Sequence, residues 1–316
     1  MGLGNLLGRL RAPRAFTSGR NAATSEPPFR RQRAVFEQLE DRMLLSVTGV
    51  FDGAVFLTAG ADVNASVLGG SQTETHIAIN PTQAGNLVVM SNGGAATNEF
   101  TATSADAGAN WTAVGVGNTQ DGLGATGSRF DGAAAVDDFG NVHIVYMARP
   151  TTNANPMGII HAMSSDGGQT YTVVNVLANA VGVDKPWIAV GPDSANPANQ
   201  VVYVTHKDGA NNIVAYGATV TGLGTMGAFS AAATVSDVAG GNYAVPTVGP
   251  NGELVVTWTR PSGGEGPVSI FVDRDLDGLA NGLAFGGDIT ATTSNAGGFD
   301  FIPATPDRSI YPSARR

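Results

Sequence analysis

Charged and aromatic residues recur near the starts of several apolar segments of this sequence, and they are the first candidates for chemistry. The segments themselves are built from Ala, Val and Ile, so the polar residues would gather at one end of predicted strands. Such a mixed set could present a polar surface to a ligand. The alternative is that each is a solvated charge at a strand end. The candidates are Glu74, His76, Arg129, Asp131, Asp184, Lys185, Tyr243, Arg308 and Tyr311.

A second candidate site is a run of alternating acidic residues near the C-terminal end. Asp273, Asp275 and Asp277 precede Gly278, and Asn281 lies four residues after Asp277. Carboxylates at alternate positions before a bend resemble the start of a calcium loop. The residue at the twelfth position is Ala284, which has no carboxylate. We therefore weigh weak Ca²⁺ binding against a modified hairpin turn, and we expect no other cofactor.

Other kinds of catalytic or metal site find little support in the sequence. The chain has no cysteine, which excludes disulfides, thiol catalysis and Cys-ligated metals. The four histidines have no metal-ligand spacing. His143 and His161 fall inside predicted strands, where we expect them to be buried residues with satisfied hydrogen bonds.

The elements that would position these residues form an internal repeat. Four segments share one layout, in which an apolar strand, a polar turn and two further apolar strands follow one another. The equivalent turn residues Asn80, Asp137, Gly191 and Gly249 recur every 54–58 residues. A four-strand repeat of this length predicts the blades of a β-propeller. The predicted blades are residues 70–125, 126–180, 181–238 and 239–292.

Segments on either side of the repeats complete the fold prediction. Residues 47–60 are β-like and could close the ring or cap the first blade, and residues 296–316 resemble the first strand of a fifth blade. We therefore predict an all-β propeller of four-stranded antiparallel blades over residues 47–316. It would have about four blades and a partial fifth, and could be a truncated form of a six-bladed propeller.

Two of the third strands end in the same short signature, S-x-D-x-G-x-[TN]-[WY]. Ser and Asp side chains accept hydrogen bonds from turn N–H groups, and Gly supplies a positive φ. The signature resembles the Asp box of sialidase-like (BNR) propellers, where it is a structural element away from the catalytic face. The matching residues are Ser104, Asp106, Gly108 and Trp111, then Ser164, Asp166, Gly168 and Tyr171.

This resemblance implies two alternative functions. A sialidase would need three arginines around a carboxylate, a tyrosine nucleophile with a glutamate partner, and an acid/base aspartate. The family's Arg-Ile-Pro element is absent, and the only similar triplet begins with Phe301. The sequence therefore favours a binding or structural module without catalysis, whose partners would be glycans or surface proteins. The alternative is an exo-acting glycoside hydrolase of the sialidase type.

The N-terminal segment 1–46 is read as a leader. It is rich in Arg, Gly, Pro and Ser, and residues 34–45 could form one short amphipathic helix. The run from Glu37 to Ser46 resembles the E-x-L-E-x-R-x-L-L-S element near the start of many large bacterial surface and secreted proteins. The resemblance implies an exported protein, secreted or held at the cell surface.

Charge and hydropathy exclude two further classes of partner. The net charge is −9, and the basic residues are concentrated in the leader, so the body is strongly acidic. An acidic body repels phosphate, which argues against nucleic-acid binding. No apolar run reaches the roughly 20 residues that a transmembrane helix needs.

Overall fold

The computed structural model is built from β-strands and turns in every part that it describes. The described residues are 44–51, 54–60, 62–66, 72–93, 99–116, 128–149, 156–261 and 268–294, and they contain no helix. By contacts the chain divides into Met1–Met43 and Leu44–Arg316. All the described residues belong to the second unit. No helix among them could span a membrane.

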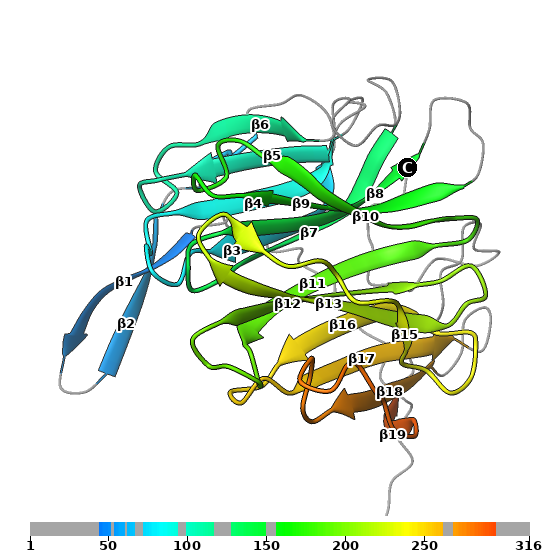
Figure 1. The fold of residues 1–316 in the computed structure, drawn as a ribbon. Helices are drawn as coiled ribbons and strands as arrows, with labels where there is room; N and C mark the ends of the chain where they lie inside the picture. Colours follow the sequence, from blue (N-terminus) through cyan, green and yellow to red (C-terminus); the bar gives the residue numbers. More distant parts are fainter. Residues whose placement is uncertain are drawn as a thin grey trace, which may run out of the picture. The chain divides into compact units, whose positions relative to one another are not determined.

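Four antiparallel sheets, called the first to fourth blades below, follow one another in chain order (Figure 1). The first contains β3 (Gln72–Ile79), β4 (Leu87–Gly93), β5 (Glu99–Ser104) and β6 (Thr112–Val116). The second contains β7 (Ser128–Val136), β8 (Val142–Arg149), β9 (Met157–Ser164) and β10 (Thr172–Ala180). The third contains β11 (Asp184–Pro192), β12 (Gln200–Lys207), β13 (Ile213–Gly222), β14 (Thr225–Met226) and β15 (Ala233–Thr234). The fourth contains β16 (Asn242–Val248), β17 (Leu254–Pro261), β18 (Val268–Asp275) and β19 (Ile289–Ser294).

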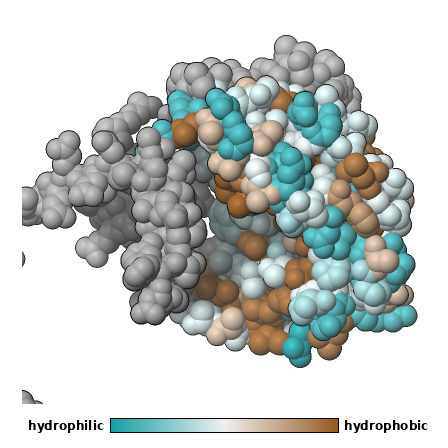
Figure 2. All heavy atoms as spheres, turned by 90° about the vertical axis from the view of Figure 1, so that its left-hand side faces the viewer, coloured by the Kyte–Doolittle hydropathy of each residue, from teal (hydrophilic) through white to brown (hydrophobic). Residues whose placement is uncertain are grey.

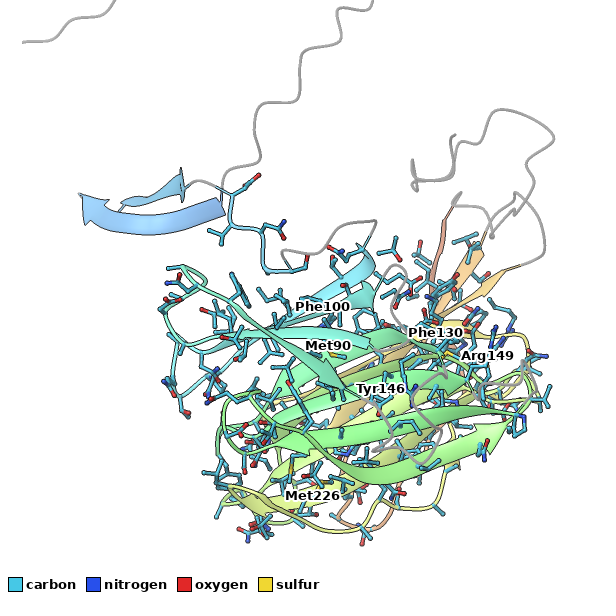
Figure 3. The ribbon with its side chains drawn as sticks, turned by 90° about the horizontal axis from the view of Figure 1, so that it is seen from above. Met90, Phe100, Phe130, Tyr146, Arg149 and Met226 are labelled. Carbon is cyan, nitrogen blue, oxygen red and sulfur yellow. The ribbon has the colours of Figure 1, made fainter. Side chains whose placement is uncertain are left out.

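Each pair of successive blades encloses one hydrophobic cluster. In β8, Ile144 and Tyr146 pack toward the first blade, whereas Val145 and Met147 pack toward the third. Met90 of the first blade belongs to the same cluster as Tyr146, and Figure 3 shows both in the interior. Because the inner blades are covered on both faces, their strands read as continuous apolar runs rather than alternating ones.

The first strands of the blades also lie beside one another. β3 contacts β7, β7 contacts β11, and β11 contacts β16. Sheets that pack face to face in chain order, with their first strands gathered at one side, are the blades of a β-propeller. The predicted fold class is therefore confirmed, and the described residues form four blades, each within its predicted range except that β19 ends at Ser294.

The segment before the first blade forms strands, as predicted for residues 47–60, but its first residues differ from the sequence prediction. β1 (Leu44–Phe51) and β2 (Ala54–Gly60) pair into a two-stranded sheet of their own, separate from the first blade's sheet. Leu44 and Leu45, the last two residues of the predicted helix, therefore begin a strand, since their backbone pairs with β2. Residues 34–43 of that helix, and the partial fifth blade at 296–316, lie outside the described residues.

The two signature turns use the hydrogen bonds that their residue types predict. Ser104 Oγ accepts the N–H of Gly108 at 2.9 Å, and Asp106 Oδ1 accepts the N–H of Asn110 at 2.8 Å. In the second blade Ser164 and Asp166 repeat both bonds, to Gly168 and Thr170. Gly108 and Gly168 have φ of +88° and +91°. Both turns are thus closed by side chains within the hairpin.

Two hairpin turns, one of them the second signature turn, also join neighbouring blades. Asn86, at the start of the second strand of the first blade, donates its amide to the carbonyl of Gly167 in the second blade's turn at 2.9 Å. Asn141 repeats this contact one blade later, donating to Gly222 of the third blade at 3.1 Å. The turns at Gly167 and Gly222 are therefore anchored to the preceding blade by a buried asparagine.

Ser164→Ala should lower the free energy of unfolding by about 1–2 kcal/mol, because it leaves the buried N–H of Gly168 without an acceptor. Urea denaturation measures the difference. Ser165→Ala is the matched control, because Ser165 is adjacent but exposed. Equal stability of the two variants would contradict a structural role for this turn.

Hydrophobic residues also reach the surface. On β3, Ile77 and Ile79 are 56% and 57% exposed. Figure 2 shows one face of the molecule, on which hydrophobic and hydrophilic residues lie side by side. The surface of the first strand therefore includes exposed aliphatic side chains as well as charged ones.

Candidate functional site

The first strand of every blade contains a β-bulge at the same place, and a non-glycine residue with a positive φ occupies each one. The four are Glu74, Asp131, Lys185 and Tyr243, with φ of 54°, 59°, 49° and 55°. The strand register shifts at each position. Side chains other than Gly rarely adopt this conformation, and bulges redirect side chains next to functional sites. All four belong to the set that the sequence singled out.

Lys185 joins the bulge residues of three successive blades. Its Nζ donates to Glu74 Oε1 at 2.5 Å and lies 3.2 Å from Asp131 Oδ1. The side chain of Asp131 is only 10% exposed, whereas that of Glu74 is 39% exposed. We call Glu74, Asp131 and Lys185 the bulge cluster. It is a partly buried, mixed-charge group that is open on the Glu74 side.

Asn92 supports the bulge cluster and Lys207 pairs with its neighbour Asp184, and the sequence analysis selected neither Asn92 nor Lys207. Asn92 Nδ2 donates to Glu74 Oε2 at 3.2 Å, and its Oδ1 accepts the N–H of Asp131 at 2.6 Å. Lys207 Nζ lies 3.5 Å from Asp184 Oδ2. Both lie on second strands, across from the bulges, and their sequence context has no recognisable motif.

Burial and the closeness of the two side chains give the two carboxyl groups of the bulge cluster different pKa values. Burial, together with the hydrogen bond and negative charge of Glu74, raises the pKa of Asp131 to about 7. Partial burial also acts to raise the pKa of Glu74, but hydrogen bonds from Asp131 and Lys185 and the ammonium charge hold it below its usual value. The shared proton therefore resides on Asp131 below neutral pH.

Asp131 is expected to titrate near pH 7, with a midpoint that falls in Glu74→Gln, because the variant removes a neighbouring negative charge. The pKa of Asp131 is higher in the folded than in the unfolded protein, so this group stabilises the fold most when the pH is below the unfolded pKa of 3.8. Its contribution declines as the pH rises toward 7. The carboxyl ¹³C shift of Asp131 measures the midpoint, and an ordinary midpoint in the wild-type protein would contradict the hydrogen-bonded pair.

An aromatic pair lies two residues beyond the bulges. His76 of β3 and Trp187 of β11 meet edge to face, with ring centroids 5.2 Å apart. Nδ1 of His76 accepts the N–H of Ala134 at 3.2 Å, so the ring proton is on Nε2 when the imidazole is neutral. Burial lowers the pKa of His76 and favours that neutral form. Trp187 is 37% exposed and offers an aromatic face beside the charges.

The remaining predicted residues are placed differently. Arg129 is buried on β7, two residues before Asp131 in the sequence, and Arg308 and Tyr311 lie outside the described residues. Arg149 lies over the ring of Phe130 (Figure 3). Arg260 pairs with Asp288 at 3.0 Å. Among the described residues, these arginines therefore form no three-membered set at the bulge cluster.

The acidic run that begins on β18 closes a turn through side-chain hydrogen bonds, as the signature turns do. Asp275 Oδ1 accepts the N–H groups of Asp277 and Gly278, and Asp277 Oδ2 accepts the amide of Asn281. Asp273 Oδ1 accepts the N–H of Gly286 at 3.2 Å. In the described part of the chain no three His, Asp or Glu side chains are grouped to hold a metal ion. These hydrogen bonds favour the interpretation of a modified hairpin turn, and calcium binding stays a prediction.

A line of buried polar residues crosses the second blade. Asp137 Oδ2 lies 3.0 Å from His143 Nε2, and His143 Nδ1 lies 3.2 Å from His161 Nε2. All three side chains are buried. His143 is hydrogen-bonded on both sides as predicted, but the prediction for His161 is wrong, since its Nδ1 has no partner in the structure. The sequence could not show this, because the outcome depends on the neighbouring blade.

Comparisons with known proteins bear on the fold alone. No known protein family matches this sequence, and no curated protein is similar to it. A Dyadobacter fermentans protein of unknown function shares 13% identity over 75% of this chain and 69% of its own, with a TM-score of 0.52. A Penicillium chrysogenum α-L-arabinanase gives 18% identity, 66% and 65% coverage and a TM-score of 0.48. A Hadza microbial sialidase shares 15% identity over 65% of this chain and 45% of its own, with a TM-score of 0.45. This chain thus spans 65% of the length of the arabinanase and 45% of that of the sialidase.

Proposed function

We propose that this propeller is a binding module without catalysis, and that its bulge cluster holds an uncharged glycan unit. The observation that carries the proposal is the convergence of Glu74, Asp131 and Lys185 from three blades through strained bulges. Strained, non-glycine positions persist where the surrounding structure holds them, and they concentrate at ligand sites.

The groups around the bulge cluster match the chemistry of a neutral sugar. Glu74 and Lys185 supply an acceptor and a donor, and His76 adds a ring N–H when neutral. Trp187 supplies an exposed aromatic face, which can pack against the apolar face of a pyranose or furanose ring. A sugar carboxylate fits less well, because the one ammonium group is already paired with two acidic residues.

The spacing of the carboxyl groups argues for binding over hydrolysis. Glycosidases hold their two carboxyl groups roughly 5–5.5 Å apart when retaining, or about 6.5–9.5 Å when inverting. Asp131 Oδ1 and Glu74 Oε1 instead both contact the Lys185 ammonium, at 3.2 and 2.5 Å, so a cation that belongs to the protein occupies the position between them. Binding without turnover is therefore the function that this geometry supports best.

A glycoside hydrolase is the second candidate, and one observation favours it. Asp131 has a pKa raised to about 7 beside a carboxylate whose pKa is lowered, which is the pairing that acid/base catalysis uses. If a ligand separated the two side chains, Asp131 could act as the acid and Glu74 as the base or nucleophile. Hydrolysis of an aryl arabinoside or sialoside that is lost in Asp131→Asn would establish this candidate.

The leader and the glycan site together suggest where the protein acts. We propose that it is exported and that it meets its glycan outside the cell, on a secreted or surface polymer. Surface proteins that carry such glycans would be its partners.

A glycan screen with the purified full chain tests the binding proposal. We expect wild-type protein to bind a neutral glycan, and both Lys185→Met and Trp187→Ala to weaken the affinity by about tenfold or more. Arg274→Met is the matched control, since Arg274 is an exposed cation on β18, outside the cluster. Equal binding by all variants, or no glycan bound by folded wild-type protein, would overturn the proposal.

A further inference from the structure

A groove between the second and third blades lies apart from the bulge cluster. Its cavity volume is about 380 Å³, and it is lined by β10 on one side and by Tyr216 and residues 229–232 on the other. Nothing in the bulge cluster contributes to its lining. The volume is sufficient for one or two sugar units.

The groove exists because the fourth strand of the third blade is interrupted. The other three blades end in one continuous strand, but here β14 and β15 are separated by residues 227–232. Ser230 fixes this segment to β13, because its N–H donates to Gly217 O at 2.8 Å and its Oγ accepts the N–H of Gly217 at 3.1 Å. The segment is therefore held in place as one wall of the groove.

The lining is amphipathic and carries no charge. Tyr216 and Phe229 supply two aromatic rings, Asn175 an amide, and Ser230 a hydroxyl, beside the aliphatic Val176 and Leu177. A charged ligand would lose its hydration here without meeting a counter-charge. Aromatic faces with a few amide and hydroxyl groups suit the mixed apolar and hydroxyl surface of a neutral sugar.

Two buried histidines lie directly behind the aromatic rings, and each has an unpaired ring nitrogen. His161 contacts Phe229 edge to face at 5.0 Å, and His206 stacks on Tyr216 at 5.6 Å. His161 Nδ1 and His206 Nε2 are buried without a hydrogen-bond partner. His161 also pairs across the strands with Asn175 of the lining. Unpaired buried polar atoms call for an explanation, and both of these lie on histidines that contact the rings lining the groove.

We infer that this groove is a second binding site, which takes one or two units of an uncharged sugar independently of the bulge cluster. An extended peptide added to the free edge of β10 is disfavoured, because two bulges, at Val173/Asn175 and Val176/Ala178, break the regular spacing of its hydrogen bonds. The groove therefore selects a compact ligand over an added strand.

Saturation-transfer NMR with the full chain tests the inference, with methyl glycosides of neutral pentoses and hexoses as probes. Phe229→Leu keeps an apolar side chain but removes the ring, and Asn175→Ala removes the amide. We expect each variant to reduce the affinity of the bound glycoside by about tenfold. Lys185→Met should lose glycoside binding at the bulge cluster only, so this variant still binds the glycoside at the groove, and adding Phe229→Leu to it should weaken the binding that remains. The ¹⁵N signal of the His161 ring should shift on addition of the glycoside to wild-type protein.

Each other result counts against the inference. It is overturned if no methyl glycoside binds at millimolar concentration, if both groove variants bind as the wild type does, or if only a peptide binds at this position. Loss of all binding in Lys185→Met, with the groove variants unaffected, would overturn the second site and leave the bulge cluster as the sugar site. The reverse pattern would overturn the function proposed for the bulge cluster and keep the groove.

Discussion

Asp137→Ala should lower the free energy of unfolding by about 3–5 kcal/mol, because it removes the charged end of a buried polar line. Asp137 Oδ1 accepts the N–H groups of Phe139 and Asn141, and Oδ2 contacts the Asn141 amide and His143. Alanine removes the acceptor of both backbone N–H groups and the partner of His143 Nε2, and His143 and Asn141 are fully buried. Chemical denaturation at neutral pH measures the loss.

Asp137→Asn is the matched variant for this prediction. It keeps one carbonyl oxygen for the backbone N–H groups but places an NH₂ group where Oδ2 accepts hydrogen bonds. We expect a loss of stability clearly smaller than that of Asp137→Ala. Wild-type stability in both variants would show that the buried line contributes nothing to folding.

The same line should make the protein sensitive to acid. Burial, together with the neighbouring His143, lowers the pKa of His161 well below 6.5, so its contribution is complete above pH 6.5 and is lost as the pH falls. Burial opposes ionisation of Asp137, but hydrogen bonds from His143 and Asn141 hold its pKa below 3.8, which adds a loss of the same sign at lower pH. Asp131 acts in the opposite direction between about pH 4 and 7. Comparing the pH profiles of wild type and Asp131→Asn separates the two effects.

Gly252→Ala is the second large effect, with an expected loss of about 3 kcal/mol. Gly252 lies in the turn between β16 and β17 and has a φ of +88°. An added Cβ would overlap the backbone nitrogen of Ser194 in the third blade and lie 2.8 Å from its Cα. Because backbone cannot move aside as a flexible side chain can, the contact between the third and fourth blades must open.

Gly282→Ala separates the steric effect from the conformational one. Gly282 has a similar φ of +84°, but an added Cβ would meet nothing within 4 Å. We expect a loss of only about 1 kcal/mol, which is the cost of a left-handed conformation for alanine. Thermal unfolding of the two variants provides the comparison, and an equal shift in Tm would refute the close approach of the two blades.

Repetition in the sequence accounts for most of the fold. The 54–58 residue spacing of Asn80, Asp137, Gly191 and Gly249 predicted one such turn in each blade, and three of these residues begin it. The prediction for Gly191 is wrong, because Gly191 pairs with Val201 within β11 and Asp193 begins the turn of the third blade. The signature residues Ser104 and Asp106 predicted the hydrogen bonds that close their turn, because those bonds span at most four residues. Periodicity and turn chemistry are local properties, so a sequence carries them directly.

Four of the candidate residues selected from the sequence lie at the bulges of the first strands, although the sequence did not show the bulges themselves. Glu74, Asp131, Lys185 and Tyr243 were chosen by residue type and repeat position, and all four occupy bulges. None of the four positions is a glycine, the residue type that would predict a positive φ, so the bulges could not be predicted from the sequence. The pairing of the first strand with the second is what imposes them.

Only the tertiary structure decided which side chains act together. Lys185 meets Glu74 from 111 positions along the chain, and Asn92 joins them from a strand that has no motif. The groove at Phe229 and the unpaired nitrogen of His161 arise where the second and third blades meet. Contacts between blades depend on how separate sheets pack, and that packing is determined by the whole hydrophobic core rather than by any single segment of sequence.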